Sequence, residues 1–279
     1  MVADMSADSP AGVRKLVAAT MNEHKVAEIS AIAGSFGYSV ISRAEAGVPD
    51  FEIEEDGATF EENALIKAGA IFDWFGGGTA TVADDSGLEV DALGGAPGVY
   101  SARFAGLAGG GSVAGAGAGS VARVGASGGS VAGAGDTTGS AGADADGGSV
   151  ADLEAAGVDA EDFAEADRDA GHMFRSRQDR ANNAKLLRLL KDVPAEKRSA
   201  RFVSVIACFR PGKAPVVCRG EVEGHIGFEA SGSAGFGYDP LFIPLGYEYS
   251  FGHFLPVDKN KISHRGRALA LLAERLAEE

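Results

Sequence analysis

The chain has 279 residues, 45% of them hydrophobic, which suffices for a substantial core in one or two domains. It contains no apolar run of 18 residues that could span a membrane, and its formal net charge of −15 argues against a general affinity for nucleic acid. The two cysteines, Cys208 and Cys218, form neither a disulfide framework nor a metal-binding motif, which is typical of reduced thiols in a cytoplasmic protein.

The N-terminal segment combines a lead-in with a possible phosphate loop. Residues 1–13 carry early acids and no apolar signal-peptide core, so we expect them to be disordered. Apolar spacing predicts a buried strand at 15–20 and a helix over 26–36, and the free N–H groups at the start of such a helix suit a phosphate. Asn22 fits a helix cap or a phosphate contact, and Lys25 supplies a positive charge; spacing alone favours the cap.

An acidic segment and a long helix follow a second predicted strand at 40–41. The stretch 50–56 (DFEIEED) alternates acids with apolar residues. This pattern fits a solvated strand edge or, through Glu54, a metal ligand. Thr59 with Glu62 three residues later predicts a capping box, and therefore a helix that runs through Trp74.

The stretch 81–106 (TVADDSGLEVDALGGAPGVYSARFAG) is the most informative part of the chain. We expect a short strand at 81–83 that turns abruptly at 84–87 (DDSG), where two carboxylates can approach a ligand. Hard divalent cations such as Mg²⁺ prefer carboxylate oxygens. An ordinary capped turn explains this tetrapeptide equally well. A glycine loop at 94–98 then precedes an aromatic ring, a hydroxyl and a guanidinium at 100–103.

Residues 107–178 differ in composition from the rest of the chain. They are rich in Gly, Ala and Ser, and the octapeptide GGSVAGAG occurs at 110–117 and again at 128–135. Their 11 acids and 4 arginines give a net charge of −7. Such a segment buries too little apolar surface to offset chain entropy, so we expect a low-complexity insertion in a surface loop. A lid over the site or a partner-binding segment is the alternative.

Regular periodicity returns after the insertion. It predicts an amphipathic helix over 179–193 and then a β-hairpin with strands at 201–210 and 214–219. Side chains alternate between the two faces of each strand. The hairpin could also place Cys208 opposite Cys218.

A glycine-rich cluster at 232–242 could hold a planar ligand. Its small residues permit close approach, Phe236 and Tyr238 offer ring faces, and Asp239 offers a hydrogen-bond acceptor. Taken alone, however, a glycine turn followed by core aromatic residues is the favoured interpretation.

The last cluster, 259–266 (KNKISHRG), opens the C-terminal helix, which we expect over 267–277. Ser263 fits the helix cap. His264 and Arg265 are cations at the helix end where the dipole disfavours positive charge. This local conflict indicates a functional role.

Four separated motifs, ATMNEHK, ADDSGLEVDALGGAPGVYSAR, GFGYDPLF and SHRG, resemble in order the inosine triphosphate pyrophosphatase family over residues 15–106 and 179–278. The resemblance implies a single domain over 14–279 that the insertion interrupts. It also implies an elongated, two-lobed α/β fold with a long, mixed, twisted sheet, flanking helices and a substrate cleft between the lobes. Members of the family are usually homodimers.

The resemblance further implies a hydrolase that acts on acid anhydrides. It would convert the non-standard purine nucleotides dITP, ITP and XTP to the monophosphate and pyrophosphate with Mg²⁺, and so cleanse the nucleotide pool. Two other readings stay open: a pyrophosphatase for other modified nucleotides, and a non-catalytic nucleotide-binding regulator.

Carried over residue by residue, the resemblance makes Asp85 the general base, and Asp85 with Glu54 the Mg²⁺ ligands. His264 and Arg265 would donate to the 6-oxo group of the purine, which adenine lacks. The chain departs from the family pattern at Met21, where a small residue is common, and in the insertion. The substrate-binding residues implied are Thr20, Met21, Asn22, Glu23, His24, Lys25, Ser86, Phe236, Gly237, Tyr238, Asp239, Lys259, His264 and Arg265.

Overall fold

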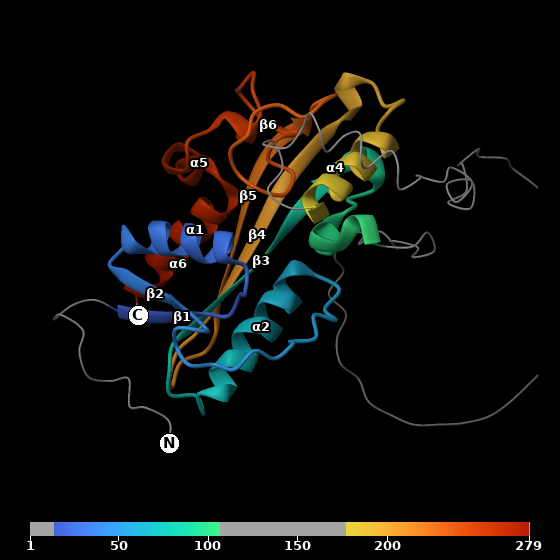
Figure 1. Ribbon diagram of the computed structural model, residues 1–279. Coiled ribbons are helices and arrows are strands. Elements are labelled where there is room, and N and C mark those ends of the chain that lie inside the picture. Colours follow the sequence, from blue (N-terminus) through green and yellow to red (C-terminus); the bar gives the residue numbers. More distant parts are fainter. Residues whose placement is uncertain (1–13, 107–176, 279) are drawn as a thin grey trace, which may run out of the picture.

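Six strands form one mixed β-sheet in the order β2-β1-β3-β4-β5-β6 (Figure 1). The computed structural model describes residues 14–106 and 177–278; the predicted lead-in and nearly all of the predicted insertion lie outside the described residues. The strands are β1 (Arg14–Ala18), β2 (Tyr38–Ser42), β3 (Thr81–Val90), β4 (Ser199–Phe209), β5 (Val216–Ile226) and β6 (Phe242–Pro244). The predicted α/β class is therefore confirmed.

The register of the sheet leaves one edge of β3 open. β1 is parallel to both β2 and β3, but it pairs with β3 only at Thr81 and Val82. On its other side β3 pairs with β4 in antiparallel fashion along its whole length, from Thr81 to Val90. Beyond Val82, therefore, no described strand lies on the β1 side of β3. The sheet has a notch at this point, where a ligand can reach the strand.

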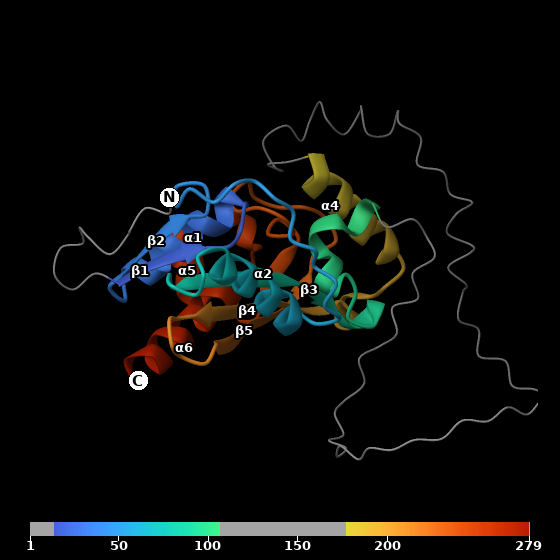
Figure 2. The same ribbon diagram turned by 90° about the horizontal axis from the view of Figure 1, so that it is seen from below.

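Helices cover both faces of the sheet, and Figures 1 and 2 show them from two directions. Helix α2 (Phe60–Trp74) packs on one face through Ala64, Ala68 and Ile71. Helices α1 (Glu23–Gly34) and α6 (His264–Ala277) pack on the other face, where Ile29 and Leu272 belong to a second apolar cluster.

The far ends of β3, β4 and β5 form a second lobe with its own apolar core. Phe104, Leu186, Phe202 and Phe251 belong to this core. The lobe also contains helices α4 (Arg177–Leu189) and α5 (Pro256–Ile262) and the 3-10 helix η2 (Gly98–Gly106). Single 3-10 turns occur at Asp91–Leu93, Ala195–Lys197 and Phe251–His253. The separate core of this lobe agrees with the predicted two-lobed arrangement.

Two side chains of α4, Asn182 and Lys185, join this helix to η2 across the segment that the structure does not describe. Asn182 on α4 accepts a hydrogen bond from the backbone N–H of Ala105 at 2.8 Å and donates to the carbonyls of Ser101 and Ala102, both at 3.2 Å. Lys185 Nζ donates to the Phe104 carbonyl at 2.9 Å. Residues 106 and 177 are therefore the ends of a closed stem.

The predicted helix caps are confirmed. The Asn22 side chain accepts from the backbone N–H groups of His24 and Lys25 at 3.0 and 3.2 Å. Thr59 forms the expected capping box with Glu62. Ser263 accepts from the Gly266 N–H at 3.0 Å at the start of α6.

Two local predictions are wrong. The strand expected to turn at Asp84 continues to Val90, because each carboxylate finds buried cations while the backbone keeps its pairing with β4. The β4–β5 turn places Val216 opposite Cys208, whereas Cys218 lies opposite Ile206. The two thiols are out of register with each other; both are buried and neither forms a disulfide.

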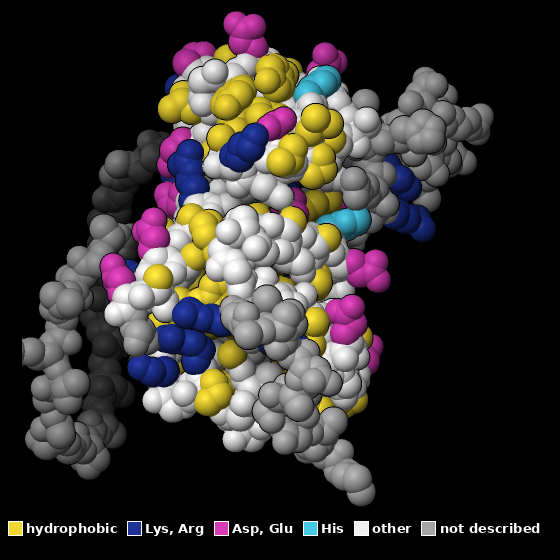
Figure 3. Space-filling model, turned by 90° about the vertical axis from the view of Figure 1, so that its left-hand side faces the viewer, with side chains coloured by type: hydrophobic (Ala, Val, Ile, Leu, Met, Phe, Trp, Pro, Cys, Tyr) yellow, Lys and Arg dark blue, Asp and Glu magenta, His cyan; other side chains and the backbone are white. Residues whose placement is uncertain are grey.

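No helix in the described part of the chain has the length and apolar character needed to cross a membrane. Exposed apolar side chains nevertheless gather at the top of the face seen in Figure 3, at the level where Figure 1 places α5 and β6. In this part of the chain the exposed large apolar residues that precede or begin α5 are Leu245, Tyr247, Tyr249, Leu255 and Val257. The rings of Tyr247 and Tyr249 pack together at a centroid distance of 5.8 Å.

Candidate active site

Two adjacent carboxylates on β3 point to opposite faces of the sheet at its notch. Successive residues of a strand alternate between faces, so a strand that passes straight through Asp84 and Asp85 must separate them. Asp84 faces α1 and α6, where it meets Lys25 and Arg265. Asp85 faces α2, where it meets Lys67. The two acids therefore have different surroundings, and Asp84 cannot share one metal shell with Asp85 as the predicted turn suggested.

Asp84 is the centre of a buried ionic network. Its carboxylate accepts from Arg265 Nη2 at 2.9 Å and from the Ser204 hydroxyl at 2.5 Å, and it lies 2.9 Å from Lys25 Nζ. Ser86 donates to the same carboxylate at 3.0 Å and accepts from Arg265 at 2.9 Å. Burial alone would raise the pKa of Asp84, but Arg265 and Lys25 hold that pKa well below its ordinary value.

Glu28, on the second turn of α1, extends this network. It bonds to Arg265 and lies 3.2 Å from Lys259 Nζ. Burial opposes the ionisation of Glu28, yet Arg265 and Lys259 lower its pKa overall. The network therefore contains three acids, Asp84, Glu28 and Asp239. They pair with the two buried cations Arg265 and Lys259 and, at Asp84, also with Lys25.

The two carboxylate oxygens of Asp85 differ in their hydrogen bonding. Its Oδ1 lies 2.5 Å from Lys67 Nζ, and Lys67 also contacts Glu55 at 3.0 Å. Its Oδ2 is buried and has no hydrogen-bond partner among the described residues. Burial raises the pKa of Asp85 although Lys67 and Lys25 pull it down. The pKa of Lys67 is raised, because Asp85 and Glu55 outweigh the burial that would lower it.

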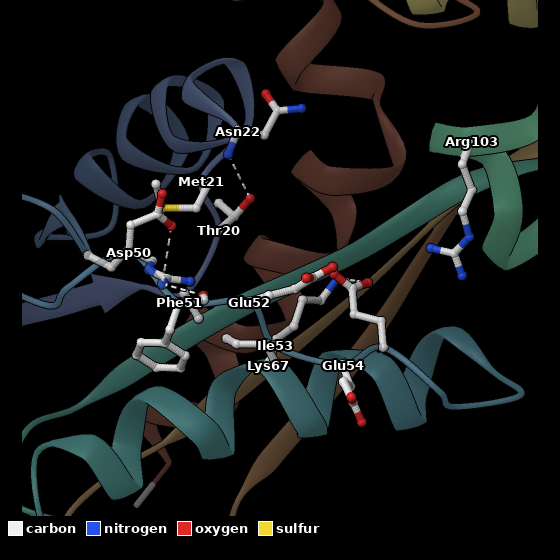
Figure 4. A pocket seen from close by; sticks show the side chains of 13 residues that line it. Thr20, Met21, Asn22, Asp50, Phe51, Glu52, Ile53, Glu54, Lys67 and Arg103 are labelled. Atoms are coloured by element: carbon white, nitrogen blue, oxygen red, sulfur yellow. Dashed lines mark hydrogen bonds and ion pairs between the residues drawn. The ribbon is translucent and has the colours of Figure 1, made fainter. Parts of the chain in front are cut away.

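An open cavity of about 600 Å³ lies beside this pair (Figure 4). The phosphate-loop residues Thr20 and Asn22 line one wall, and Arg103 from η2 lies on the opposite side. Arg103 stacks on the Tyr100 ring at 5.2 Å and forms no ion pair within the described ranges. The remaining lining residues are Ala19, Met21, Arg43, Asp50, Phe51, Glu52, Ile53, Glu54, Glu55 and Lys67.

The acid nearest the Lys67–Asp85 pair is Glu55, not the predicted metal ligand Glu54. Glu54 lines the cavity, but Figure 4 shows its carboxylate pointing away from Lys67. Glu55 is only 36% exposed and pairs with Lys67 directly. Along an extended segment consecutive side chains point in opposite directions, which explains why only one of these neighbours faces Asp85.

The predicted phosphate loop, residues 20–25, divides between two environments. Thr20, Met21 and Asn22 line the cavity, and Met21 is 53% exposed there. Glu23 and His24 begin α1, and Lys25 reaches Asp84 on the other face. The loop therefore connects the cavity to the ionic network around Asp84.

The predicted base-binding cluster lies on the side of Asp84. Phe236 stacks against His24, and Lys259 Nζ lies 4.7 Å from the Phe236 ring centroid. Asp239 accepts from the Phe236 N–H at 2.8 Å and from Lys259 Nζ at 2.6 Å. Burial raises the pKa of Asp239, and Lys259 opposes this shift. The Gly237 N–H donates to Asp179 at 3.0 Å.

Tyr238 and His264 are core residues in this structure. Tyr238 is 4% exposed and its hydroxyl donates to the Ser101 carbonyl at 2.8 Å. His264 stacks on Phe202 with a centroid distance of 4.9 Å. Burial, together with Arg265 and Lys259, holds the pKa of His264 well below its ordinary value. His264 Nδ1 and Arg265 Nε are both buried without a partner among the described residues.

Sequence reasoning missed Lys67, Glu55 and Glu28. Lys67 lies between Ala64 and Ala68 on the buried stripe of α2, and a lysine on such a stripe was a readable signal. Glu55 could not be distinguished from its acidic neighbours without the direction of each side chain. Glu28 pairs with residues more than 200 positions away, so no local pattern reveals it.

Comparison with known proteins gives matches over nearly the whole chain. The sequence model of the Ham1 family matches residues 16–118 and 149–275. A protein of Exiguobacterium sibiricum named dITP/XTP pyrophosphatase is 36% identical over 258 residues, which cover 92% of this chain and 94% of that protein. A dITP/XTP pyrophosphatase of Desulforamulus reducens is 38% identical over 256 residues, or 91% and 92% of the two chains.

Solved structures with the same fold include two similar proteins. The HAM1 protein from Coxiella burnetii superposes with a TM-score of 0.63 at 29% identity, covering 96% of this chain and 100% of that one. The dITP/XTP pyrophosphatase from Mycobacterium abscessus gives a TM-score of 0.56 at 34% identity, covering 92% and 98%.

Proposed function

The chain belongs to the Ham1 family, and we propose that it hydrolyses dITP, ITP and XTP to the nucleoside monophosphate and pyrophosphate. Such a reaction removes non-standard purines from the nucleotide pool. The names of the relatives support the substrate class. The observation that carries the proposal is Asp85 Oδ2, a buried carboxylate oxygen with no hydrogen-bond partner among the described residues, whose neighbour Lys67 lines an open cavity.

Asp85 has the properties of a general base. A base works best when its pKa is close to the working pH, and burial moves the pKa of Asp85 upward. Lys67 binds Oδ1 and so orients the carboxylate while Oδ2 stays available. In the proposed reaction a water oxygen attacks the α-phosphorus and gives its proton to Asp85. The bond between the α-phosphorus and the bridging oxygen breaks, and pyrophosphate leaves.

The donor set at this point fits Mg²⁺. Magnesium usually takes one or two carboxylates and completes its shell with substrate phosphates and water. Asp85 Oδ2 is an unsatisfied carboxylate oxygen, and Glu55 lies across Lys67 from it. No larger acid, histidine or cysteine cluster that could hold a metal alone exists in the described residues. Bound Mg²⁺ would neutralise phosphate charge; Asp85 with Glu55, or Glu54 after a side-chain rotation, would hold it.

Three cations around the notch can offset the remaining charge of the triphosphate. Lys67 and Lys25 flank β3 from its two faces, and Arg103 lies across the cavity from Thr20. The N-terminus of α1, capped by Asn22, adds a favourable dipole. These groups are needed because four acids line the same cavity, namely Asp50, Glu52, Glu54 and Glu55.

Recognition of the purine falls to the cluster around Phe236. A 6-oxo group is a hydrogen-bond acceptor, and the unpartnered Arg265 Nε and the Nδ1–H tautomer of neutral His264 are both donors. Adenine would present an amino donor to these donors. A site whose buried donors stay unpaired can reject the wrong ligand by several powers of ten.

Pyrophosphate release from ITP, dITP, XTP, GTP, ATP, dUTP and dTTP in the presence of Mg²⁺ tests the proposal. We expect turnover to be confined largely to the first three. Asp85→Asn should reduce turnover by about 10²–10⁴-fold while ITP still binds. Turnover of pyrimidines alone would contradict the recognition argument, and binding of ITP by the wild type without turnover would favour a regulator.

We also propose that the chain forms a homodimer, as the family resemblance implies. The exposed apolar side chains near α5, including Tyr249 and Leu255, support an association surface. Light scattering coupled to size-exclusion chromatography should give twice the chain mass; a monomer at micromolar concentration would contradict this.

A further inference from the structure

His24 and Phe236 form a parallel pair of rings between two distant parts of the chain. Their centroids are 5.6 Å apart and their planes differ by 17°. His24 comes from the first turn of α1, and Phe236 from the glycine-rich segment before β6. The pair of rings lies on the side of the notch where Asp84 and Arg265 also lie.

Each ring stands on a fixed backbone. Asn22 accepts from the His24 N–H at 3.0 Å, and Asp239 accepts from the Phe236 N–H at 2.8 Å. One turn further along α1, Glu28 binds Lys259 and Arg265. The two segments that carry the rings are thus held in a constant relative position, as the walls of a binding slot require.

His24 does not belong to the phosphate end of the loop. Thr20, Met21 and Asn22 line the acidic cavity that Lys67 also lines, whereas His24 is not among its lining residues. The His24 ring instead packs on Phe236, whose centroid lies 4.7 Å from Lys259 Nζ and 5.9 Å from Arg265 Cζ. Hydrogen-bond donors for a base edge therefore surround this pair of rings.

We propose that His24 and Phe236 are the two walls of a slot that sandwiches the purine, so that His24 reads the base and not the phosphates. This inference rests on the proposed function and adds a specificity-determining residue to it. A planar ring between two others needs walls about 7 Å apart, at roughly 3.5 Å per stacking contact. In the structure the two ring centroids are 5.6 Å apart, so the rings must move apart before a base can lie between them.

A movement of the His24 side chain can provide this opening. His24 is exposed, and exposed side chains change rotamer within nanoseconds. The walls are already almost parallel, which is the orientation of an offset stack. Stacking on a ring face tolerates any base, so His24 contributes affinity for the purine while the donors of the neighbouring network distinguish its substituents.

Steady-state kinetics with ITP on His24→Ala, His24→Leu and His24→Phe test the slot. Stacking of a base on an aromatic ring is lost in the alanine variant, and we expect its KM to rise roughly tenfold. His24→Leu has similar bulk without a ring face and should also raise KM. His24→Phe should restore KM to within about twofold of the wild type. The melting temperature of each variant should stay at the wild-type value, since His24 is exposed.

Three results for the His24 variants would overturn the inference. An unchanged KM for His24→Ala would show that the ring makes no contact with substrate. A lower KM would show that the His24 side chain blocks the slot and does not form one of its walls. Equal defects in His24→Phe and His24→Ala would exclude stacking as the cause. Absence of ITP turnover by the wild type would refute the proposed function itself, and the slot with it, before any variant is compared.

Discussion

The buried network around Asp84 should be a larger contributor to stability than any surface ion pair of this protein. The perturbation we consider is Asp84→Asn, which removes the charge and keeps the side-chain size. Asp84 is 1% exposed and pairs with Arg265 and Lys25, both at 2.9 Å. The variant would leave two cations, Arg265 and Lys25, on this side of the sheet. Glu28 would then be the carboxylate that still pairs with Arg265.

The expected loss follows from these contacts. Removing one partner of a buried ion pair typically costs about 3–5 kcal/mol, because the other charge stays buried. Glu28 continues to neutralise Arg265, and the asparagine amide can still accept one hydrogen bond, so we expect the lower part of this range, about 3 kcal/mol. For a domain of this size that corresponds to a fall in melting temperature of about 6–12 °C.

Urea denaturation and thermal melting at pH 7 measure this loss. Glu221→Gln is the matched control, since it makes the same chemical change in an ion pair of 2.5 Å whose partners, Arg219 and Glu221, are 47% and 37% exposed. Exposed pairs contribute about 0–1 kcal/mol. If Asp84→Asn were no more destabilising than Glu221→Gln, the argument from burial would be refuted.

Three further predictions follow from the carboxylate, lysine and histidine of the site. Asp85→Asn should reduce kcat about 10²–10⁴-fold, and because burial penalises the charged form, its melting temperature should equal or exceed that of the wild type; a clear loss of stability would contradict this. Lys67→Met removes the cation that lowers the pKa of Asp85, so the acidic limb of the pH–rate profile should move to higher pH; an unmoved limb would exclude Asp85 as the titrating base. His264 stays neutral in the fold but takes a proton in the unfolded chain below pH about 6.5, so stability should fall as pH drops, by about 1.4 kcal/mol between pH 7.5 and 5.5. When His264→Phe is denatured at both pH values, its stability should change less with pH than that of the wild type, by this same amount. An equal change with pH in variant and wild type would refute the claim that His264 stays neutral in the fold.

The sequence predicted best those features that depend only on residue type and on spacing along the chain. The caps at Asn22, Thr59 and Ser263 were predictable, because a side chain of the right type precedes each helix by a fixed interval. The β4–β5 hairpin was predictable from its period of two and its Pro-Gly turn. The glycine-rich motifs located the region of the site without revealing which of their rings face a ligand.

The course of β3 could not be predicted in the same way. Two adjacent aspartates read as a turn, because an unpaired carboxylate does not stay in a buried strand. What keeps them there is a set of cations from α1, α2 and α6, the last more than 150 residues away. Glu55 and not Glu54 pairs with Lys67, and the sequence does not give the direction of these neighbouring side chains. The metal pair of Asp85 and Glu54 stays a prediction.

Because Asn182 closes this stem, the protein should tolerate segments inserted between residues 106 and 177. Because hydrogen bonds from α4 fix the end of η2, the position of Arg103 depends on the stem and not on the length of chain between residues 106 and 177. Loop-closure entropy grows only slowly with length, by about 0.6 kcal/mol per doubling. A fluorescent or affinity domain placed between these two residues would therefore be carried without disturbing the notch, which makes this junction the preferred point for fusion or for circular permutation of the chain.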